Sequence, residues 1–176
     1  LVVPVCDGLP YYQAYIIVNN QTQFNSLIDL KGKKFAFTDH LSFSGKRYIV
    51  DRIMRSYNVF PEDFFSETIY TNAHDISIQM VSKNLVDGAS VDGLIYKYFE
   101  KTAPHKIKNL RIIEKSGLYG IPPVVTAKNI DPRLKQELTE FFLHSDKEPQ
   151  SRAILKKLMI DRFVAAGDTL YSSIGD

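Results

Sequence analysis

The chain has 176 residues, 44% of them apolar and 24% charged, and its formal net charge is only +2 at pH 7. This length suits one domain, or one lobe with part of a second, and the 10 Tyr and 11 Phe residues can fill a sizeable core without Trp. The near balance of charge gives no reason to expect nucleic acid or a membrane surface as a partner, and no apolar run approaches the ~18 residues of a membrane span.

The first half of the chain alternates strand and helix signals. Aromatic and β-branched residues predict a strand at 11–18, and a second strand is expected at Lys34–Thr38. Apolar residues recur at helical spacing from Ser44 to Tyr57. The elements expected next are a strand at Glu67–Tyr70, a helix over 73–88 with Ile78, Val81 and Leu85 inward, a strand at Ala89–Val91, and a helix from about Asp92 carrying Leu94, Ile95, Tyr98 and Phe99.

Two further strands are predicted, at 109–116 and 122–128. The alternation of strand and helix is typical of an α/β fold with a mainly parallel sheet and flanking helices. The tail differs, because Asp131 and Pro132 predict the start of a helix and a second helix follows. The residues expected to face inward from these helices are Leu134, Leu138 and Phe141 in the first and Ile154, Leu155 and Leu158 in the second. No strand is predicted after Thr126, so these helices should pack on something other than the first sheet.

The segment DHLSFSGKRY, residues 39–48, lies between a predicted strand and a predicted helix. The amino end of a helix leaves backbone N–H groups unpaired and attracts anions. Ser42 and Ser44 can add hydroxyl donors, and Gly45 would let a ligand approach the backbone. The alternative is a serine that caps an ordinary helix, with the glycine easing the turn.

Two other loops occupy equivalent positions after predicted strands. His74, in TNAHD, could bind the same anion as the serines, or it could be a surface residue beside a helix cap. Asp92 could accept a hydrogen bond from a ligand or cap its own helix. Tyr11 and Tyr12 could form a ligand wall, or they could be packing residues of a strand.

Other chemical signals are weak. The four histidines have no metal-like spacing, and the single Cys6 excludes an intramolecular disulfide. No nucleophile motif is present, so neither an enzyme nor a cofactor is expected. The cations of one helix predict a solvated face, and they are Lys46, Arg47, Arg52 and Arg55.

The chain resembles the phosphate, phosphite and phosphonate-binding proteins of ABC importers, which are type II periplasmic binding proteins. The most specific segment is DLKGKKFAFTDHLSFSGKRY, which resembles the family's strand followed by Ser-Thr-Ser-Gly. TNAHD is similar to the family's Thr-Gly-Ser-His-Asp, and YYQAYIIV, VDGASVDGLIYKYF, EKSGLYGIPPVV and IDRFVAAGDTLYSSI resemble further family segments.

This resemblance implies a first interlobe crossing at 1–12, a ligand-binding α/β lobe at 13–120, and a return crossing with a C-terminal helical segment at 121–176. It implies ligand contacts from the serine turn with its residue 43 N–H, from the histidine loop and from the hinge tyrosines. The residues concerned are Ser42, Phe43, Ser44, Gly45, His74, Tyr12 and Tyr11, with Asp92 as a further candidate. The implied partners are a small phosphorus oxyanion and the membrane subunits of an ABC importer. The implied location is periplasmic or extracytoplasmic, and attachment as a lipoprotein is compatible with it.

Three residues depart from the family pattern. Phe43 stands where the family usually has Thr, so one hydroxyl donor is lost. Leu94 and Pro122 lie where binders of amine-bearing phosphonates have carboxylates. Burying an unpaired ammonium group is costly, so we expect a ligand without an amine: phosphate, phosphite or a simple phosphonate.

By the same resemblance the chain begins at the first crossing and lacks the N-terminal half of one lobe. The expected fold is therefore one complete lobe plus the C-terminal helices of the other. The expected function is delivery of the oxyanion to an importer by hinged closure of two lobes. The alternative is the extracytoplasmic sensing domain of a membrane signalling protein, either a histidine kinase or a cyclase.

Overall fold

The structure, a computed structural model, describes residues 1–174, and its contacts divide them into two compact units. Unit 1 contains Leu1–Tyr12 and the chain from Leu118 onward, and unit 2 contains Gln13–Gly117. Within the described residues every helix is too short or too polar to cross a membrane.

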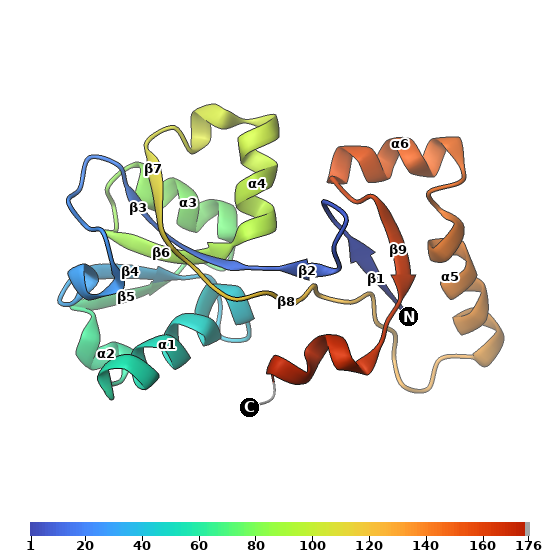
Figure 1. Ribbon diagram of the computed structural model, residues 1–176, viewed down its shortest axis with the longest axis horizontal. Coiled ribbons are helices and arrows are strands. Elements are labelled where there is room, and N and C mark those ends of the chain that lie inside the picture. Colours follow the sequence, from blue (N-terminus) through green and yellow to red (C-terminus); the bar gives the residue numbers. More distant parts are fainter. Residues whose placement is uncertain (175–176) are drawn as a thin grey trace. The chain divides into compact units, whose positions relative to one another are not determined.

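Unit 2 is built on a five-stranded sheet in the order β5-β4-β6-β3-β7 (Figure 1). The strands are β3 (Ala14–Asn19), β4 (Lys34–Phe37), β5 (Glu67–Tyr70), β6 (Gly88–Asp92) and β7 (Leu110–Lys115). β4 pairs in parallel with β5 and with β6, whereas β3 is antiparallel to both β6 and β7. Four of the five strands therefore run in one direction, and the expected α/β class is confirmed, although the sheet is mixed because both pairings of β3 are antiparallel.

Helices cover both faces of this sheet. Figure 1 shows α3 (His74–Ser82) and α4 (Gly93–Thr102) on one face, with α1 (Tyr48–Tyr57) and α2 (Pro61–Phe64) on the other. The side chains of β4 alternate between the two faces of the sheet. Ala36 packs in the cluster under α3 and α4, whereas Phe35 and Phe37 are buried on the opposite side. Three short helical turns complete the unit: η1 (Leu27–Leu30), η2 (Phe43–Arg47) and η3 (Pro104–Lys106).

α3 is shorter than predicted, and α4 buries only some of its apolar residues. α3 ends at Ser82 because Asn84 takes a left-handed conformation (φ 55°), so Leu85 is 57% exposed and Val86 is buried in its place. α4 turns Tyr96 and Phe99 inward. Of the apolar residues expected on this helix, Ile95 and Tyr98 are each 37% exposed.

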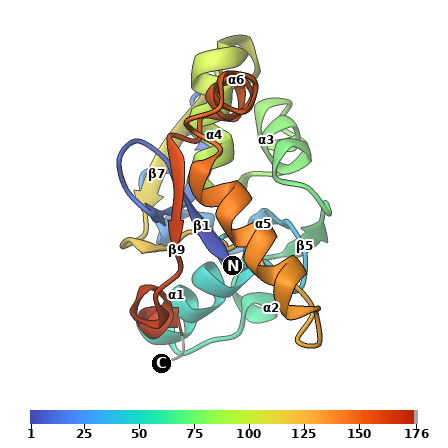
Figure 2. The same ribbon diagram turned by 90° about the vertical axis from the view of Figure 1, so that its right-hand side faces the viewer.

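Unit 1 contains two small antiparallel pairs and two helices. β1 (Val2–Val5) pairs with β9 (Arg162–Ala165), and β2 (Tyr11–Tyr12) pairs with β8 (Tyr119–Gly120). The predicted strand at 11–18 is thus divided at Gln13 between the two units. α5 (Pro132–His144), α6 (Pro149–Leu158) and the turn η4 (Asp168–Ile174) follow. Figure 2 shows β1 beside β9 with α5 against them, and Val2, Leu155 and Phe163 form the centre of their core.

The C-terminal predictions are only partly confirmed. Asp131 caps α5 as predicted, with its side chain accepting from the N–H groups of Arg133 and Leu134. The predicted strand at 122–128 reduces to one isolated bridge between Val124 and Val2, and a strand, β9, does follow the two helices. Several residues predicted to face inward are 46–60% exposed, because the unit 1 cluster covers only part of each helix; they are Leu134, Phe141, Ile154 and Leu158.

Candidate functional site

The loops that follow β4, β5 and β6 begin at the same edge of the unit 2 sheet, because the three strands are parallel. The loop after β4 leads into η2, and Ser42 is its N-cap: the Ser42 hydroxyl accepts from the Gly45 N–H at 3.0 Å. The capping interpretation of Ser42 is therefore correct. A hydroxyl that accepts one hydrogen bond still has its own proton to donate, so capping does not remove Ser42 as a ligand contact.

Ser44 is a buried residue of η2. The residue is only 3% exposed, and its backbone carbonyl accepts from the Ser90 hydroxyl at 2.6 Å, which fixes the turn on β6. Within the described residues no fully buried side-chain oxygen or nitrogen lacks a hydrogen-bond partner. The Ser44 hydroxyl is therefore not a buried unpaired group; it lies on the turn at the carboxyl edge of the sheet, where it can donate to a ligand oxygen. Phe43, the first residue of η2, is half-buried.

Gly45 is required by packing against the end of β4. A Cβ on this residue would lie 2.5 Å from the Thr38 Cβ and 2.8 Å from the Ser42 hydroxyl oxygen. The Thr38 N–H donates to the Gly45 carbonyl at 3.2 Å, which keeps the two segments together. Gly45 was expected either to admit a ligand to the backbone or to ease the turn, and the structure shows that Thr38 lies close to it.

His74 is the first residue of α3, and its ring lies against the ends of two neighbouring strands. The Thr38 hydroxyl oxygen is 3.0 Å from Nδ1, and the Asp92 N–H donates to the same nitrogen at 3.1 Å. Burial lowers the pKa of His74 below its usual value, against the opposing charges of Asp39 and Asp75. The loops after β4, β5 and β6 therefore converge on one imidazole.

Asp92 caps α4, as the capping alternative predicted. Its Oδ1 accepts from the Leu94 N–H at 2.7 Å, and burial raises the pKa of its carboxyl to about 6. Leu94 itself is half-buried, and Pro122 is an exposed residue of unit 1.

Tyr11 and Tyr12 belong to unit 1, where β2 pairs them with Gly120 and Tyr119. Tyr11 is 37% exposed and Tyr12 is 6% exposed. Their role as ligand contacts stays a prediction from the resemblance.

Thr38 is the site residue that the sequence analysis missed. It was read only as the last residue of a strand, yet it is 3% exposed and contacts both the serine turn and His74. The sequence does show a hydroxyl residue at the carboxyl end of a buried strand, directly before the loop at residues 39–48, and this is where ligands of such sheets bind. No group of three or more His, Cys, Asp or Glu side chains within residues 1–174 could hold a metal ion.

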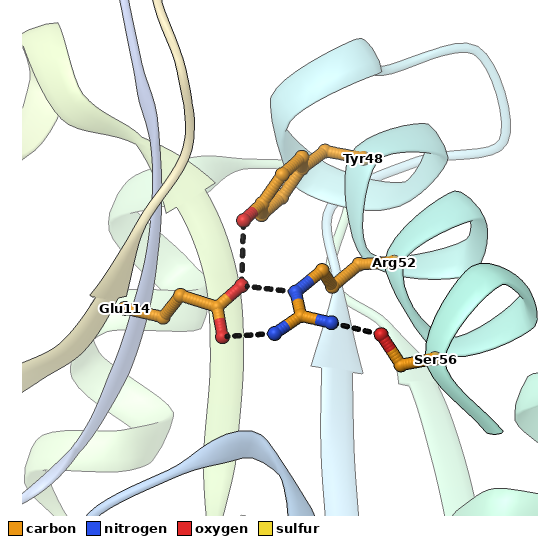
Figure 3. A network of polar contacts seen from close by, with 4 residues as sticks. All are labelled: Tyr48, Arg52, Ser56 and Glu114. Atoms are coloured by element: carbon orange, nitrogen blue, oxygen red, sulfur yellow. Dashed lines mark hydrogen bonds and ion pairs between the residues drawn. The ribbon is translucent and has the colours of Figure 1, made fainter.

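A polar network ties the helix after η2 to the sheet (Figure 3). The Tyr48 hydroxyl donates to Glu114 Oε1 at 2.6 Å, and Arg52 Nε donates to the same oxygen at 2.9 Å. A second guanidinium nitrogen of Arg52 donates to Ser56. Because Tyr48 follows η2 directly, Glu114 on β7 helps to fix the position of the serine turn. Arg52 is thus engaged with the sheet, and the prediction of a wholly solvated cationic face was wrong.

We expect Glu114→Gln to lower the free energy of unfolding by about 1–2 kcal/mol, because hydrogen bonds to an ionised group contribute more than neutral ones. Urea denaturation followed by circular dichroism measures this change. The matched control is Glu67→Gln, which breaks an ion pair with Lys34 between two half-exposed side chains and should have a much smaller effect. Equal losses in the two variants would show that the Glu114 network has no special role.

The chain is similar to known proteins over nearly its whole length. Residues 1–171 match a family described as "ABC transporter, phosphonate, periplasmic substrate-binding protein". The phosphonates-binding periplasmic protein of Escherichia coli (strain K12) is 30% identical over 166 residues, which are 92% of this chain and 48% of that protein. This chain therefore spans about half the length of that curated relative.

Two solved structures have the same fold. A binding protein component of an ABC phosphonate transporter from Pseudomonas aeruginosa gives a TM-score of 0.89 at 26% identity, over 98% of this chain and 59% of its own. PhnD1 from Prochlorococcus marinus (MIT 9301), solved in complex with methylphosphonate, gives 0.84 at 20% identity, over 99% of this chain and 68% of its own.

The α/β architecture and these likenesses define the chain as part of a type II periplasmic binding protein. Since the family match covers residues 1–171, the chain belongs to the periplasmic substrate-binding proteins of phosphonate ABC transporters. The resemblance found in the sequence is confirmed. Nothing in the comparisons supports the sensing alternative, and the relatives are transport proteins.

Proposed function

We propose that this chain binds a phosphonate at the carboxyl edge of the unit 2 sheet, through Ser42, Ser44 and His74, in a periplasmic protein that delivers the ligand to an ABC importer. The family description and the name of the Escherichia coli relative support the ligand class and the transport role. Because the chain spans 48% of that relative, the ligand, the transporter partner and the periplasmic location of the whole protein all belong to this proposal.

The position of the Ser44 hydroxyl is the main support for this proposal. The hydroxyl belongs to a residue that is only 3% exposed, and the turn that carries it is held on β6 by the hydrogen bond from Ser90 to the Ser44 carbonyl. A phosphonate oxygen would accept from this hydroxyl, and the amino end of a helical turn favours the negative charge.

The surroundings favour a phosphonate without an amine. Leu94, in the first turn of α4, offers no charge to an ammonium group. The Asp92 carboxylate already accepts from the Leu94 N–H. Phosphate and phosphite offer a protein the same kind of oxygen atoms as a simple phosphonate. A binding experiment therefore has to distinguish among these three ligands.

We expect calorimetry on the purified protein to detect methylphosphonate binding that Ser44→Ala weakens about tenfold to a hundredfold. This range corresponds to a hydrogen bond to an ionised group. Phosphate, phosphite and 2-aminoethylphosphonate, titrated in parallel, define the preference, and 2-aminoethylphosphonate should bind more weakly than methylphosphonate.

Ser66→Ala is the matched control, because Ser66 is an exposed serine just before the amino end of β5, at the opposite edge of the same sheet. Methylphosphonate affinity should not change in this variant. Absence of binding by all four compounds would refute the oxyanion function, and tighter binding of 2-aminoethylphosphonate would refute the exclusion of amines.

A further inference from the structure

The ring of His74 is held at one nitrogen by two groups from different strands. The Asp92 N–H, at the end of β6, and the Thr38 hydroxyl, at the end of β4, lie 3.1 Å and 3.0 Å from Nδ1. A backbone N–H can only donate, so Nδ1 must present its lone pair to it. The proton of the neutral imidazole is then on Nε2.

Thr38 is itself fixed on every side. It is 3% exposed, its N–H donates to the Gly45 carbonyl at 3.2 Å, and its carbonyl accepts from the Asn72 N–H at 2.7 Å. Its hydroxyl therefore cannot follow the ring if the ring turns. Since Nδ1 carries no proton in this arrangement, the hydroxyl donates to Nδ1 as well, and the two donors fix the orientation of the imidazole.

We propose that Thr38 is a positioning residue which, together with the Asp92 N–H, holds His74 as the Nε2–H tautomer, so that His74 meets the bound oxyanion as a neutral hydrogen-bond donor. The part concerning the oxyanion rests on the proposed function. The part concerning the tautomer depends only on contacts within unit 2.

Protonation of the ring would work against these contacts. An imidazolium carries a proton on both nitrogens, so Nδ1–H would point at the Asp92 N–H and leave that donor without an acceptor. Burial of the ring acts in the same direction. Two carboxylates near His74 act in the opposite direction, Asp39 after β4 and Asp75 in α3.

Nitrogen-15 NMR of the ligand-free protein tests the tautomer directly. With histidine labelled at both ring nitrogens, His74 at pH 7.5 should show an unprotonated Nδ1 and a protonated Nε2. The chain has four histidines, so a His74→Gln variant assigns the signals. A proton found on Nδ1 of His74 would overturn the proposal.

Thr38→Val keeps the shape of the side chain and removes the hydroxyl. Only the Asp92 N–H then holds Nδ1, so the ring is less firmly oriented. We expect the His74 nitrogen signals to move part of the way toward those of a ring that exchanges between tautomers, and methylphosphonate affinity to fall about tenfold, the effect of one hydrogen bond. Thr38→Ser retains the hydroxyl and should restore both. Unchanged signals and affinity in Thr38→Val would contradict the positioning role.

Thr22→Val is the control for the loss of a threonine hydroxyl just after a strand. Thr22 follows β3, which runs antiparallel to β6, so it lies at the opposite edge of the sheet; its hydroxyl donates to the Asn19 carbonyl at 2.7 Å, and the His74 signals should stay as in the wild type. If methylphosphonate does not bind at all, the proposed function fails, while the NMR of the ligand-free variants still decides the role of Thr38.

Discussion

Gly45→Ala is expected to lower the free energy of unfolding by about 1–3 kcal/mol, the usual cost of forcing an extra carbon into a packed site. The new methyl group would lie 2.5 Å from the Thr38 Cβ and 2.8 Å from the Ser42 hydroxyl oxygen. Neither neighbour can move cheaply, because Thr38 is buried at the end of β4 and Ser42 accepts from the Gly45 N–H. Urea denaturation followed by circular dichroism measures the loss.

The same substitution should weaken methylphosphonate binding more than an effect on stability alone would. Moving Thr38 disturbs its contact with His74, and moving Ser42 changes the cap of the serine turn. Calorimetry at a temperature where the variant is fully folded separates the two effects. Full retention of affinity would show that this packing does not position the ligand contacts.

Gly117→Ala is the control for Gly45→Ala, because a Cβ there meets nothing within 4 Å. Its free energy of unfolding should stay within the small range of surface substitutions. Adding Thr38→Gly to Gly45→Ala removes both the hydroxyl and the Cβ that lie nearest the new methyl group. The double variant should therefore lose less stability than the sum of the single variants, and strict additivity would argue against the steric explanation.

The fold of unit 2 was largely predictable because its strands and helices carry local signals. β5 has the predicted bounds Glu67–Tyr70. Every residue of β3 is buried, and the strand accordingly has a run of β-branched and aromatic residues that is clear in the sequence. The reversed direction of β3 was not predictable, since strand direction depends on pairing and not on composition. β1 and β9 were missed because each has four residues and pairs with a segment far away in the sequence, and Pro4 argues against a strand.

The candidate site was predictable where one segment carries its own signal. The serine turn and His74 both follow strands that the sequence reveals. Thr38 was not found, because its role depends on His74, which is 36 residues away in the sequence and adjacent only in the fold. For Gly45 the sequence indicated that a side chain was excluded, but it could not show that Thr38 is the group that excludes it.

Asp92→Asn is expected to stabilise unit 2 at pH 7.5 by up to about 3 kcal/mol and to have little effect at pH 4. Burial raises the pKa of the Asp92 carboxyl from 3.8 to about 6 in the folded protein. The folded state therefore binds more protons than the unfolded state between these two values, and Asp92 makes the protein less stable as the pH rises through this window. A shift of this size corresponds to about 3 kcal/mol once the carboxyl is ionised in both states.

Asparagine removes the buried charge and keeps the cap, since its side-chain oxygen can still accept from the Leu94 N–H. Urea denaturation at several pH values between 4 and 7.5 measures the difference from the wild type, which should be small at pH 4 and grow through pH 6. Asp29→Asn is the control of opposite sign, because hydrogen bonds from Asn25 and Ser26 lower the pKa of that exposed carboxyl. It should lower stability at pH 7.5. This loss should begin to shrink as the pH falls through the ordinary pKa of 3.8, and it should vanish only below the still lower pKa of the folded state, where Asp29 is protonated in both states. A gain from Asp92→Asn that does not depend on pH would mean that Asp92 destabilises the fold by something other than its buried charge.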